Sequence, residues 1–392
     1  MSSLRAAVGY QERPRLKSVE VCEVGSRRQR DQFLRFPWSI YRHDPVWVPP
    51  LLAERKEFLS PRKHPFYRHG AAVQFLALAD GRPVGRVLAS DDPNYNAAHG
   101  TNTGCFGMFE CIDDPGVAQA LLDAVAGWLA ARGRSQMLGP IDYSTNYACG
   151  LLIEGFDTPP RVLMNHNPPY YAGLLESCGL RKAKDLYGWS FVISDYPTRK
   201  FGRLADRIAR RGKVTIRPFN LKDKVAEIAR CKEVYNTAWQ SNWGFVRMSD
   251  SEFDHFANGL TQLVSPQLLL IAEVEGRPVG LSLTLPDFNE AMRPLNGRLF
   301  KWGLPLGLLQ FLRNCRRLHA CRVVALGVIE EQRRRGLSEL LIMRAAENAR
   351  QQGITWAELG WTLEDNLAIN HAIEEVGGVR YKTFRIYEKP LD

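Results

Sequence analysis

The chain is 392 residues long, with 45% hydrophobic and 24% charged residues. This is the composition of an ordinary soluble globular protein, which argues against a disordered chain, and the length predicts two or three domains. The formal net charge of +10 suits anionic partners such as phosphorylated cofactors, nucleic acid or an anionic surface, although an arginine-rich proteome would produce the same excess.

Targeting and cysteine patterns point to the cytoplasm. The eight cysteines form no C-x-x-C pair and no Cys/His cluster of zinc spacing, so we expect reduced thiols and no metal site. Residues 1–17 lack the apolar core of a signal peptide and are expected to be a flexible arm. The longest apolar stretch, 303–312, is too short to cross a bilayer but could form an interfacial or lid helix.

The first half of the chain reads as a mixture of strands and helices. An alternating segment at 19–24 predicts a strand, and helical spacing follows at 27–41. Residues 75–89 predict a β-hairpin around Asp80-Gly81. Three further elements, a strand, a helix and a strand, are predicted at 104–112, 117–132 and 136–141.

The second half repeats this order. The pentapeptide Gly-Arg-Pro-Val-Gly occurs at 81–85 and again at 276–280, both times in a predicted hairpin turn. The segment 175–181 has a similar counterpart at 374–380. The matching strand, helix and strand of the second half are expected at 321–329, 338–353 and 355–361. We therefore predict two copies of one α/β unit, 18–195 and 214–392, with a connecting helix at 196–213.

The stretch from 322 to 353 predicts an anion-binding site. A β-branched apolar run is followed by a basic turn, Gly336 and an amphipathic helix. The first turn of a helix has unpaired N–H groups and a partial positive charge, and Gly336 would let a ligand approach the backbone. A phosphate or pyrophosphate would be held at such a turn. An ordinary solvated basic turn is the alternative.

The hexapeptide Arg333-Arg334-Arg335-Gly336-Leu337-Ser338 resembles the Q/R-x-x-G-x-G/A signature of the GNAT N-acetyltransferase superfamily, with Ser338 where Gly or Ala is usual. The order of elements also resembles the GNAT fold across nearly the whole chain. The resemblance implies two tandem GNAT-like domains, each a mixed α/β sheet flanked by helices. It also implies that acetyl-CoA or another acyl-CoA binds the second domain through Leu326, Val328, Arg333, Arg334, Arg335, Gly336, Leu337, Ser338 and Asn366. The tyrosine that often protonates the departing thiolate in GNAT enzymes is replaced by Ile373.

The first copy lacks the phosphate turn. Asp113 is the expected N-cap of its helix and Pro115 an expected first-turn residue, and the two carboxylates of Asp113 and Asp114 would repel a pyrophosphate. Polar and tyrosine-rich segments in the first copy, together with the end of the second hairpin, suit either substrate binding or hydrogen-bonded turns. The candidate substrate-binding residues are Asp142, Tyr143, Asn146, Asn165, Asn167, Tyr170, Asp287 and Asn289.

A long insertion at 290–320 separates the second hairpin from the cofactor strand. It mixes Phe300, Trp302 and Phe311 with five arginines. Two interpretations stay open: a lid over the acyl chain or acceptor, and a segment that packs against the first copy.

The predicted reaction is direct acyl transfer from acyl-CoA to an amine of a small molecule or peptide bound between the domains. The ammonium must lose a proton before attack, so a carboxylate or histidine should act as base. The candidates are Glu330, Glu358, Glu364, Asp287 and His166. Backbone N–H groups at a break in the 323–329 strand could polarise the thioester oxygen.

Two rival functions remain open. A non-catalytic acyl-CoA-binding or regulatory protein would fit the missing tyrosine, and Fem-like aminoacyl transfer from charged tRNA would fit the positive charge. Nucleic acid is the less favoured partner because the basic residues are dispersed. The oligomeric state is not indicated.

Overall fold

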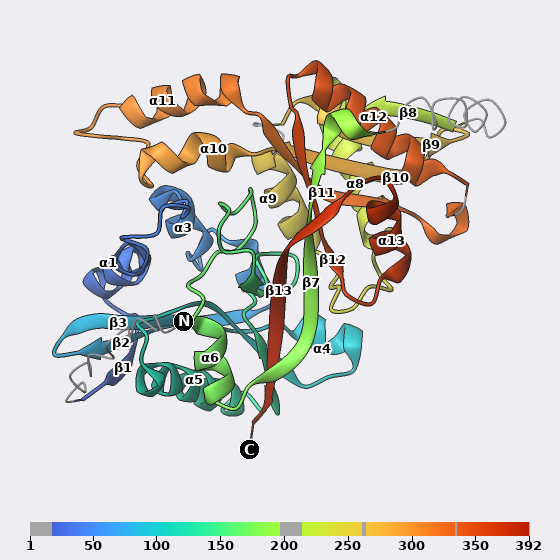
Figure 1. Cartoon of the computed structure of the whole chain (residues 1–392). Coiled ribbons are helices and arrows are strands. Elements are labelled where there is room, and N and C mark those ends of the chain that lie inside the picture. The colour runs from blue at the N-terminus through green and yellow to red at the C-terminus, as the bar shows by residue number, and fades with distance from the viewer. Residues whose placement is uncertain (1–17, 197–213, 261–263, 334, 392) are drawn as a thin grey trace, which may run out of the picture.

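The computed structural model describes residues 18–196, 214–260, 264–333 and 335–391, whose strands form one 13-stranded mixed sheet (Figure 1). Helices cover the sheet on both sides, which confirms the predicted mixed α/β fold. The expected N-terminal arm, 1–17, and residues 197–213 of the expected connecting helix lie outside the described residues.

The first half supplies seven strands and six helices within the described residues. Its strands are β1 (Glu20–Glu23), β2 (Ala71–Ala79), β3 (Arg82–Asp91), β4 (Thr103–Cys111), β5 (Gln136–Gly139), β6 (Leu151–Glu154) and β7 (Arg181–Val192). Its helices are α1 (Arg27–Arg35), α2 (Pro37–Ile40), α3 (Leu52–Phe58), α4 (Pro93–His99), α5 (Pro115–Ala130) and α6 (Tyr171–Ser177). The single helix expected at 27–41 is wrong: it is divided before Pro37, which cannot donate a backbone hydrogen bond.

The second half repeats the pattern. Its strands are β8 (Val214–Pro218), β9 (Leu269–Val274), β10 (Arg277–Pro286), β11 (Ala320–Val328), β12 (Trp356–Leu363) and β13 (Val379–Pro390). Its described helices are α8 (Lys224–Ala238), α9 (Asp250–Leu260), α10 (Phe288–Met292), α11 (Leu306–Asn314), α12 (Leu337–Gln351) and α13 (Leu367–Glu375).

The two predicted hairpins have the same turn geometry. In β2–β3 the turn residues Asp80 and Gly81 have φ of 48° and 71°, and in β9–β10 Glu275 and Gly276 have 51° and 82°. Positive φ at both central residues gives a twist that matches the flanking strands. The repeated pentapeptide therefore marks the same structural position in both halves.

The halves exchange their last strands. The sheet order is β1-β2-β3-β4-β5-β13-β7-β12-β11-β10-β9-β8. Strand β13 of the second half pairs with β5 of the first, whereas β7 of the first half pairs with β12 of the second. The two exchanged strands also pair with each other. Each half is therefore completed by a strand of the other.

The segment between β10 and β11 joins the halves at a second place. The Asn296 side chain accepts a 2.6 Å hydrogen bond from Trp38, and the Gly297 carbonyl accepts one of 3.1 Å from Leu52. A Cβ atom on Gly297 would lie 2.7 Å from the Trp38 ring. The base of the 290–320 insertion thus packs against the first half, while its tip, before α11, extends at the upper left of Figure 1.

Candidate functional site: a splayed strand pair, an apolar cavity and a buried carboxylate

The turn between β11 and α12 leaves the start of the helix open. Gly336 is the N-cap, with φ of 77°, and no side chain caps the first turn. A residue with a Cβ would be strained in this left-handed conformation. The N–H groups that follow Gly336 are therefore available to an anion, as they are at phosphate-binding helix starts.

The three arginines of this turn differ in their surroundings. The Arg333 guanidinium donates to the carbonyl groups of Val328, at 3.2 Å, and Ala238, at 2.8 Å. It ties the turn to the end of α8. Arg335 is exposed and donates to the Gln332 side chain at 2.9 Å. Arg334 lies outside the described residues.

The equivalent helix start in the first half is closed. The Asp114 side chain caps α5 and accepts from the N–H groups of Gly116 and Val117 at 2.8 and 3.2 Å. The sequence expectation of Asp113 as N-cap is wrong by one residue, but the physical consequence is the same. A carboxylate of the chain occupies the place that a phosphate would need.

Strands β11 and β12 separate beside this turn. Their parallel pairing runs only from Ala320–Trp356 to Val323–Leu359. The pairing of β11 with β10 shifts register between Leu283 and Thr284, so that β11 carries a bulge at Val324. Beyond this point, within the part of the chain that the structure describes, β11 has no ladder with β12, which agrees with the break expected in this strand. Leu326 and Val328, two predicted cofactor-binding residues, lie in the separated part.

The remaining predicted cofactor-site residues lie at the starts of helices α12 and α13. Leu337 is buried and Ser338 half-buried in the first turn of α12. Asn366 is the exposed N-cap of α13, where its side chain accepts from the Ile369 N–H at 3.4 Å. Ile373 sits later on α13 against Gly378, and its side chain offers no proton.

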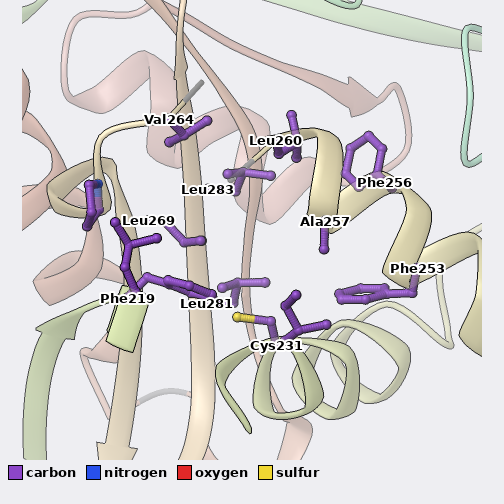
Figure 2. Close-up of a pocket in the computed structure, with 13 residues that line it drawn as sticks. Phe219, Cys231, Phe253, Phe256, Ala257, Leu260, Val264, Leu269, Leu281 and Leu283 are labelled. Atoms are coloured by element: carbon purple, nitrogen blue, oxygen red, sulfur yellow. The ribbon is translucent and has the colours of Figure 1, made fainter. Parts of the chain in front are cut away.

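An apolar cavity lies between the sheet and helices α8 and α9 (Figure 2). It is partly open to solvent, and almost all of its accessible lining is apolar. The lining includes Phe219, Cys231, Phe253, Ala257, Leu281 and Leu283.

The cavity adjoins the separated strands. Leu283, in its wall, pairs directly with Ala325 at the bulge of β11, and neighbouring strands lie about 4.8 Å apart. The Trp239 ring also reaches this region, because a Cβ atom on Gly327 would lie 2.5 Å from it. An acyl group held at the bulge would therefore need to cross only one strand to reach the cavity.

Glu358 is a fully buried carboxylate on β12. Within the described residues, neither of its oxygens meets a donor at hydrogen-bonding geometry. Burial raises its pKa to about 7. The hydroxyl of Tyr381 and the cations Arg322, Arg161 and Lys382 lower this pKa because they stabilise the carboxylate, but the effect of burial is larger.

The first half supplies the surroundings of Glu358. A Cβ atom on Gly188 of β7 would lie 3.0 Å from the Glu358 carboxylate. The Arg322 guanidinium donates to the Val162 carbonyl at 2.8 Å, and the Lys382 ammonium donates to the Thr158 carbonyl at 2.9 Å. Burial lowers the pKa of Lys382 to about 8. The site thus includes both halves.

Glu358 and the cavity share one face of the sheet. Leu285 pairs with Arg322, and Arg322 pairs with Glu358, so these three side chains point to the same side. Leu281 and Leu283 alternate with Leu285 along β10 and point there too. The opposite face is covered by α12, because a Cβ on Gly280 would lie 3.2 Å from the Leu341 side chain of that helix.

The other predicted bases have different environments. Glu330 is exposed on a short 3-10 turn after β11. The remaining three carboxylate or imidazole groups are held by charged partners at 3.0, 2.5 and 2.7 Å: Asp287 by Arg161, Glu364 by Lys182 and His166 by Asp44. Burial lowers the pKa of His166. Glu358 therefore differs from these three in having unpaired oxygens.

Several residues predicted to bind substrate use their polar groups within the fold. Asn165 and Tyr170 donate to backbone carbonyls at 2.7 and 2.8 Å. The Asn167 amide both accepts from and donates to the backbone of Leu152. Asn289 donates to the Pro160 carbonyl at 2.8 Å. These contacts favour the hydrogen-bonded-turn interpretation.

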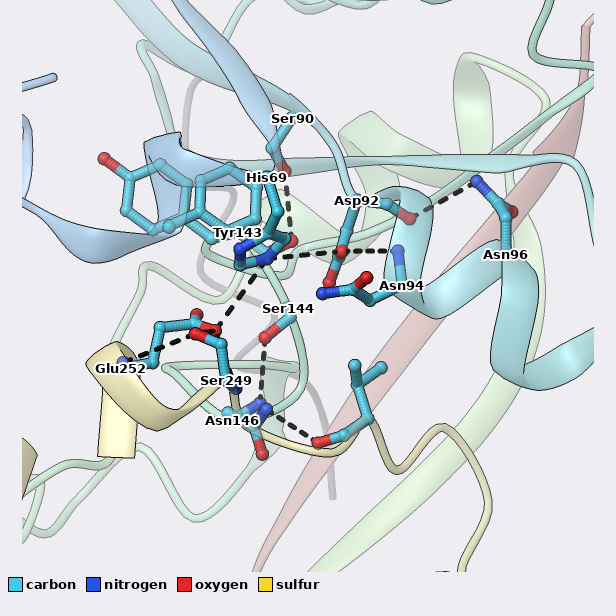
Figure 3. Close-up of polar contacts among 12 residues, drawn as sticks. His69, Ser90, Asp92, Asn94, Asn96, Tyr143, Ser144, Asn146, Ser249 and Glu252 are labelled. Carbon is cyan, nitrogen blue, oxygen red and sulfur yellow. Dashed lines mark hydrogen bonds and ion pairs between the residues drawn. The ribbon is translucent and has the colours of Figure 1, made fainter. Parts of the chain in front are cut away.

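The loop from 142 to 147 makes hydrogen bonds to both halves of the chain. The Asp142 side chain accepts from the Met108 N–H at 2.9 Å, and the buried Tyr143 hydroxyl donates to a backbone carbonyl at 2.8 Å. Asn146 accepts from Tyr235 of α8 at 3.0 Å. Figure 3 shows this loop beside Glu252 of α9.

Sequence reasoning missed Arg322, Lys382 and Arg161, the cations around Glu358. Charged residues inside apolar strand segments were the available signal for Arg322 and Lys382. The cavity was also missed, because its lining comes from helices and strands distant in sequence. Within the described residues no cluster of three or more His, Cys, Asp or Glu side chains could hold a metal ion.

Comparison with solved structures identifies the fold class. A tandem GNAT protein from the clavulanic acid biosynthesis pathway matches with a TM-score of 0.57 over 96% of this chain and 99% of its own, at 13% identity. A glucosamine N-acetyltransferase region of a fungal multi-domain β-N-acetylglucosaminidase gives 0.58, also at 13% identity, over 95% of this chain and 38% of its own. The protein therefore has the tandem GNAT fold that its sequence predicted.

Two proteins are similar along nearly their whole length. Protein YghO of Escherichia coli K12 is 37% identical over 366 residues, 92% of each chain. A bacterial ceramide synthase of Caulobacter vibrioides is 35% identical over 384 residues, 95% of this chain and 98% of its own. No family model matches the sequence. The chain belongs to the family that contains these two proteins, and the fold and relatives support acyl transfer as the general activity.

Proposed function

We propose that the protein is an acyl-CoA-dependent N-acyltransferase that joins a long acyl chain to the amine of a long-chain amino alcohol. The observation that carries this proposal is the 35% identity, over nearly both full lengths, to a protein named a bacterial ceramide synthase. A ceramide is the N-acyl amide of such an amino alcohol. The product class of this chain is therefore proposed to be the same.

The donor is proposed to bind the second half. Its diphosphate would accept hydrogen bonds from the uncapped N–H groups that follow Gly336. The pantetheine arm would lie between the separated parts of β11 and β12, with Leu326 and Val328 beside it. The capped helix start at Asp114 argues against a second donor site in the first half.

The apolar cavity is the structural argument for a long acyl chain in the donor. It lies one strand from the bulge at Val324, where the thioester would be placed. Each buried methylene group contributes about 0.8 kcal/mol to binding. A chain in this cavity would therefore gain affinity with length, whereas an acetyl group would gain almost nothing there.

Glu358 is the proposed base. The acceptor ammonium transfers a proton to the Glu358 carboxylate, and the free amine then attacks the thioester carbonyl carbon. The carbon–nitrogen bond forms, the nitrogen releases its second proton to solvent, and the carbon–sulfur bond breaks. CoA leaves as a thiolate that takes up a proton from solvent, so a neutral amide and a free thiol result. A pKa near 7 keeps Glu358 able to accept a proton at neutral pH. Backbone N–H groups at the bulge would stabilise the oxyanion.

The test is a product assay with matched panels. Purified protein is incubated with acyl-CoAs of about 2 to about 18 carbons, a range chosen because each buried methylene adds to binding. The acceptors are sphinganine, a short amino alcohol and a lysine peptide. Amides are detected by mass spectrometry and free thiol by colour reaction. We expect an amide of sphinganine from long acyl-CoAs only.

Two outcomes would redirect the proposal. Tight acyl-CoA binding without thiol release for any acceptor would favour the non-catalytic alternative, which the isoleucine at position 373 also favours. Amide formation only with the short amino alcohol or the peptide would exclude the lipid acceptor.

A further inference from the structure

The tip of the 290–320 insertion presents an exposed apolar ridge. We use this name for six side chains: Phe300, Trp302, Leu304, Leu306, Leu309 and Leu312. Their exposed fractions run from 41% to 91%, and Trp302 has the highest. Six of the twelve exposed large apolar side chains among the described residues fall in these 13 positions. Scattered exposed leucines need no explanation, but such a concentration marks an interaction surface.

The apolar ridge is held in place by its own buried face. The Phe311 side chain is 8% exposed and lies 6.2 Å from the Phe288 ring of α10. A Cβ atom on Gly307 would lie 2.2 Å from the Arg298 carbonyl, so α11 packs closely on the preceding segment. Main-chain hydrogen bonds of 3.0 and 2.9 Å join Lys301 and Leu304. The exposed side chains are therefore displayed by a folded element.

The charged side chains at 291–319, the part of the insertion that carries the apolar ridge, are all of one sign. Residues 291–319 contain no Asp or Glu. They contain six basic residues, namely Arg293, Arg298, Lys301, Arg313, Arg316 and Arg317. Within the described part of the chain, none of these six forms an ion pair with a carboxylate. The positive charges are therefore available to an external anionic partner.

We propose that the apolar ridge is a docking surface for an anionic phospholipid bilayer. Exposed leucine and phenylalanine side chains, a tryptophan at the tip and flanking arginines are the features of segments that lie in the membrane interface. The partner is a bilayer because the surface projects at an outer corner of the molecule (Figure 1) and combines apolar side chains with uncompensated positive charge. Among the described helices, none is long and apolar enough to cross a membrane.

This inference goes beyond the proposed function and does not depend on it. The apolar ridge connects to the catalytic half through the buried Phe288, Leu295 and Phe311, which belong to the same core cluster as Leu283 of the cavity wall. Docking there would place the cavity half of the molecule near lipid substrates. Vesicle binding is measured without any acyl transfer, so a failure to bind would leave the acyltransferase proposal untouched.

The experiment is vesicle flotation with the full chain. Vesicles contain either phosphatidylcholine alone or phosphatidylcholine with about one third phosphatidylglycerol, a composition chosen because anionic lipid attracts basic segments. We expect the protein to float with the anionic vesicles and to remain largely in solution with the neutral ones. Raising the salt concentration should weaken the binding.

Two variants and a control test the surface. Trp302→Glu combined with Leu309→Glu removes the apolar contact and should lower the vesicle partition coefficient at least about tenfold. Reversing Arg313, Arg316 and Arg317 to Glu should lower it about 100-fold or more, since each basic residue near an anionic surface contributes roughly fivefold. The control Val225→Glu alters an apolar side chain on α8 that is 85% exposed and should float like the wild type.

Three results would overturn the proposal. The first is a wild-type protein that stays in solution with anionic vesicles, and the second is unchanged flotation of the Trp302/Leu309 variant. The third is a wild-type dimer, seen by analytical ultracentrifugation, that this variant dissociates, because a second copy would then occupy the surface. All substituted side chains are exposed, so the thermal unfolding midpoint should stay near the wild-type value and serves as the folding control.

Discussion

The Glu358→Gln substitution gives the most detailed prediction of the site. Burial raises the Glu358 pKa from 4.5 to about 7. A carboxyl group with a raised pKa in the folded state binds protons more tightly there than in the unfolded chain. Its contribution to stability is therefore lost as pH rises from 4.5 to about 7, by about 3 kcal/mol at 1.36 kcal/mol for each pKa unit.

Glutamine has nearly the same shape and does not titrate. The free energy of unfolding of Glu358→Gln minus that of the wild type should therefore rise by about 3 kcal/mol between pH 4.5 and pH 7, and then level off. Urea unfolding at a series of pH values measures this difference. Other titrating groups cancel in it, provided that the comparison stays below pH 7.5, where Lys382 with its pKa of about 8 begins to contribute.

Activity supplies the second readout for this substitution. A general base contributes about 10²–10⁴-fold, so kcat/KM for amide formation should fall at least about 100-fold in Glu358→Gln. Its rise with pH around 7 should disappear. The matched control is Glu364→Gln, which removes a partly exposed ion pair with Lys182 and should change little. If the free energies of unfolding of Glu358→Gln and the wild type changed equally with pH, the raised pKa would be refuted. An unchanged kcat/KM would refute the role of Glu358 as base.

Three further predictions concern the donor site, the cavity and the exchanged strands. Gly336→Glu should weaken CoA binding at least about 100-fold in calorimetry, because a carboxylate replaces the anion at the helix start. The control Gly353→Glu lies at the other end of α12, with φ of 79° and open space around it, and should bind CoA normally. An equal loss of affinity in both variants would contradict the site. Ala257→Phe should fill the cavity and lower the affinity for a 16-carbon acyl-CoA about 50-fold if roughly three methylenes are excluded, with no effect on acetyl-CoA. The control Ala229→Phe, on the exposed face of α8, should change the affinity for neither donor. Weaker binding of both donors would point to misfolding. Because β7 and β13 are exchanged, the two halves should unfold in one calorimetric transition, and two separated transitions would show that the halves are independent.

The sequence predicted much of the fold for local reasons. Alternating residues and Asp80-Gly81 or Glu275-Gly276 specify hairpins within short segments, and the repeated order predicted two copies of one unit. The strand exchange could not be predicted this way. Strands β7 and β13 have similar patterns, and whether β13 pairs with β12 of its own half or with β5 of the other depends on contacts between residues far apart in sequence.

Only the part of the candidate site that lies in one contiguous motif could be predicted from the sequence. Gly336 and its turn form a contiguous motif, so the open helix start could be read from the sequence. Glu358 was one of five candidate bases that sequence could not rank, since its burial depends on Gly188 and on the loop that carries Val162. The cavity requires α8 and α9 to be placed over β9 and β10, which no local pattern specifies.

The most direct test of the proposed donor site is a solved complex with a long-chain acyl-CoA carrying a non-hydrolysable thioether. We expect the diphosphate to contact the N–H groups that follow Gly336 and the acyl chain to occupy the cavity lined by Leu281, Leu283 and Ala257. A coenzyme bound at the α5 start near Asp114, or an acyl chain outside the cavity, would contradict the proposed site.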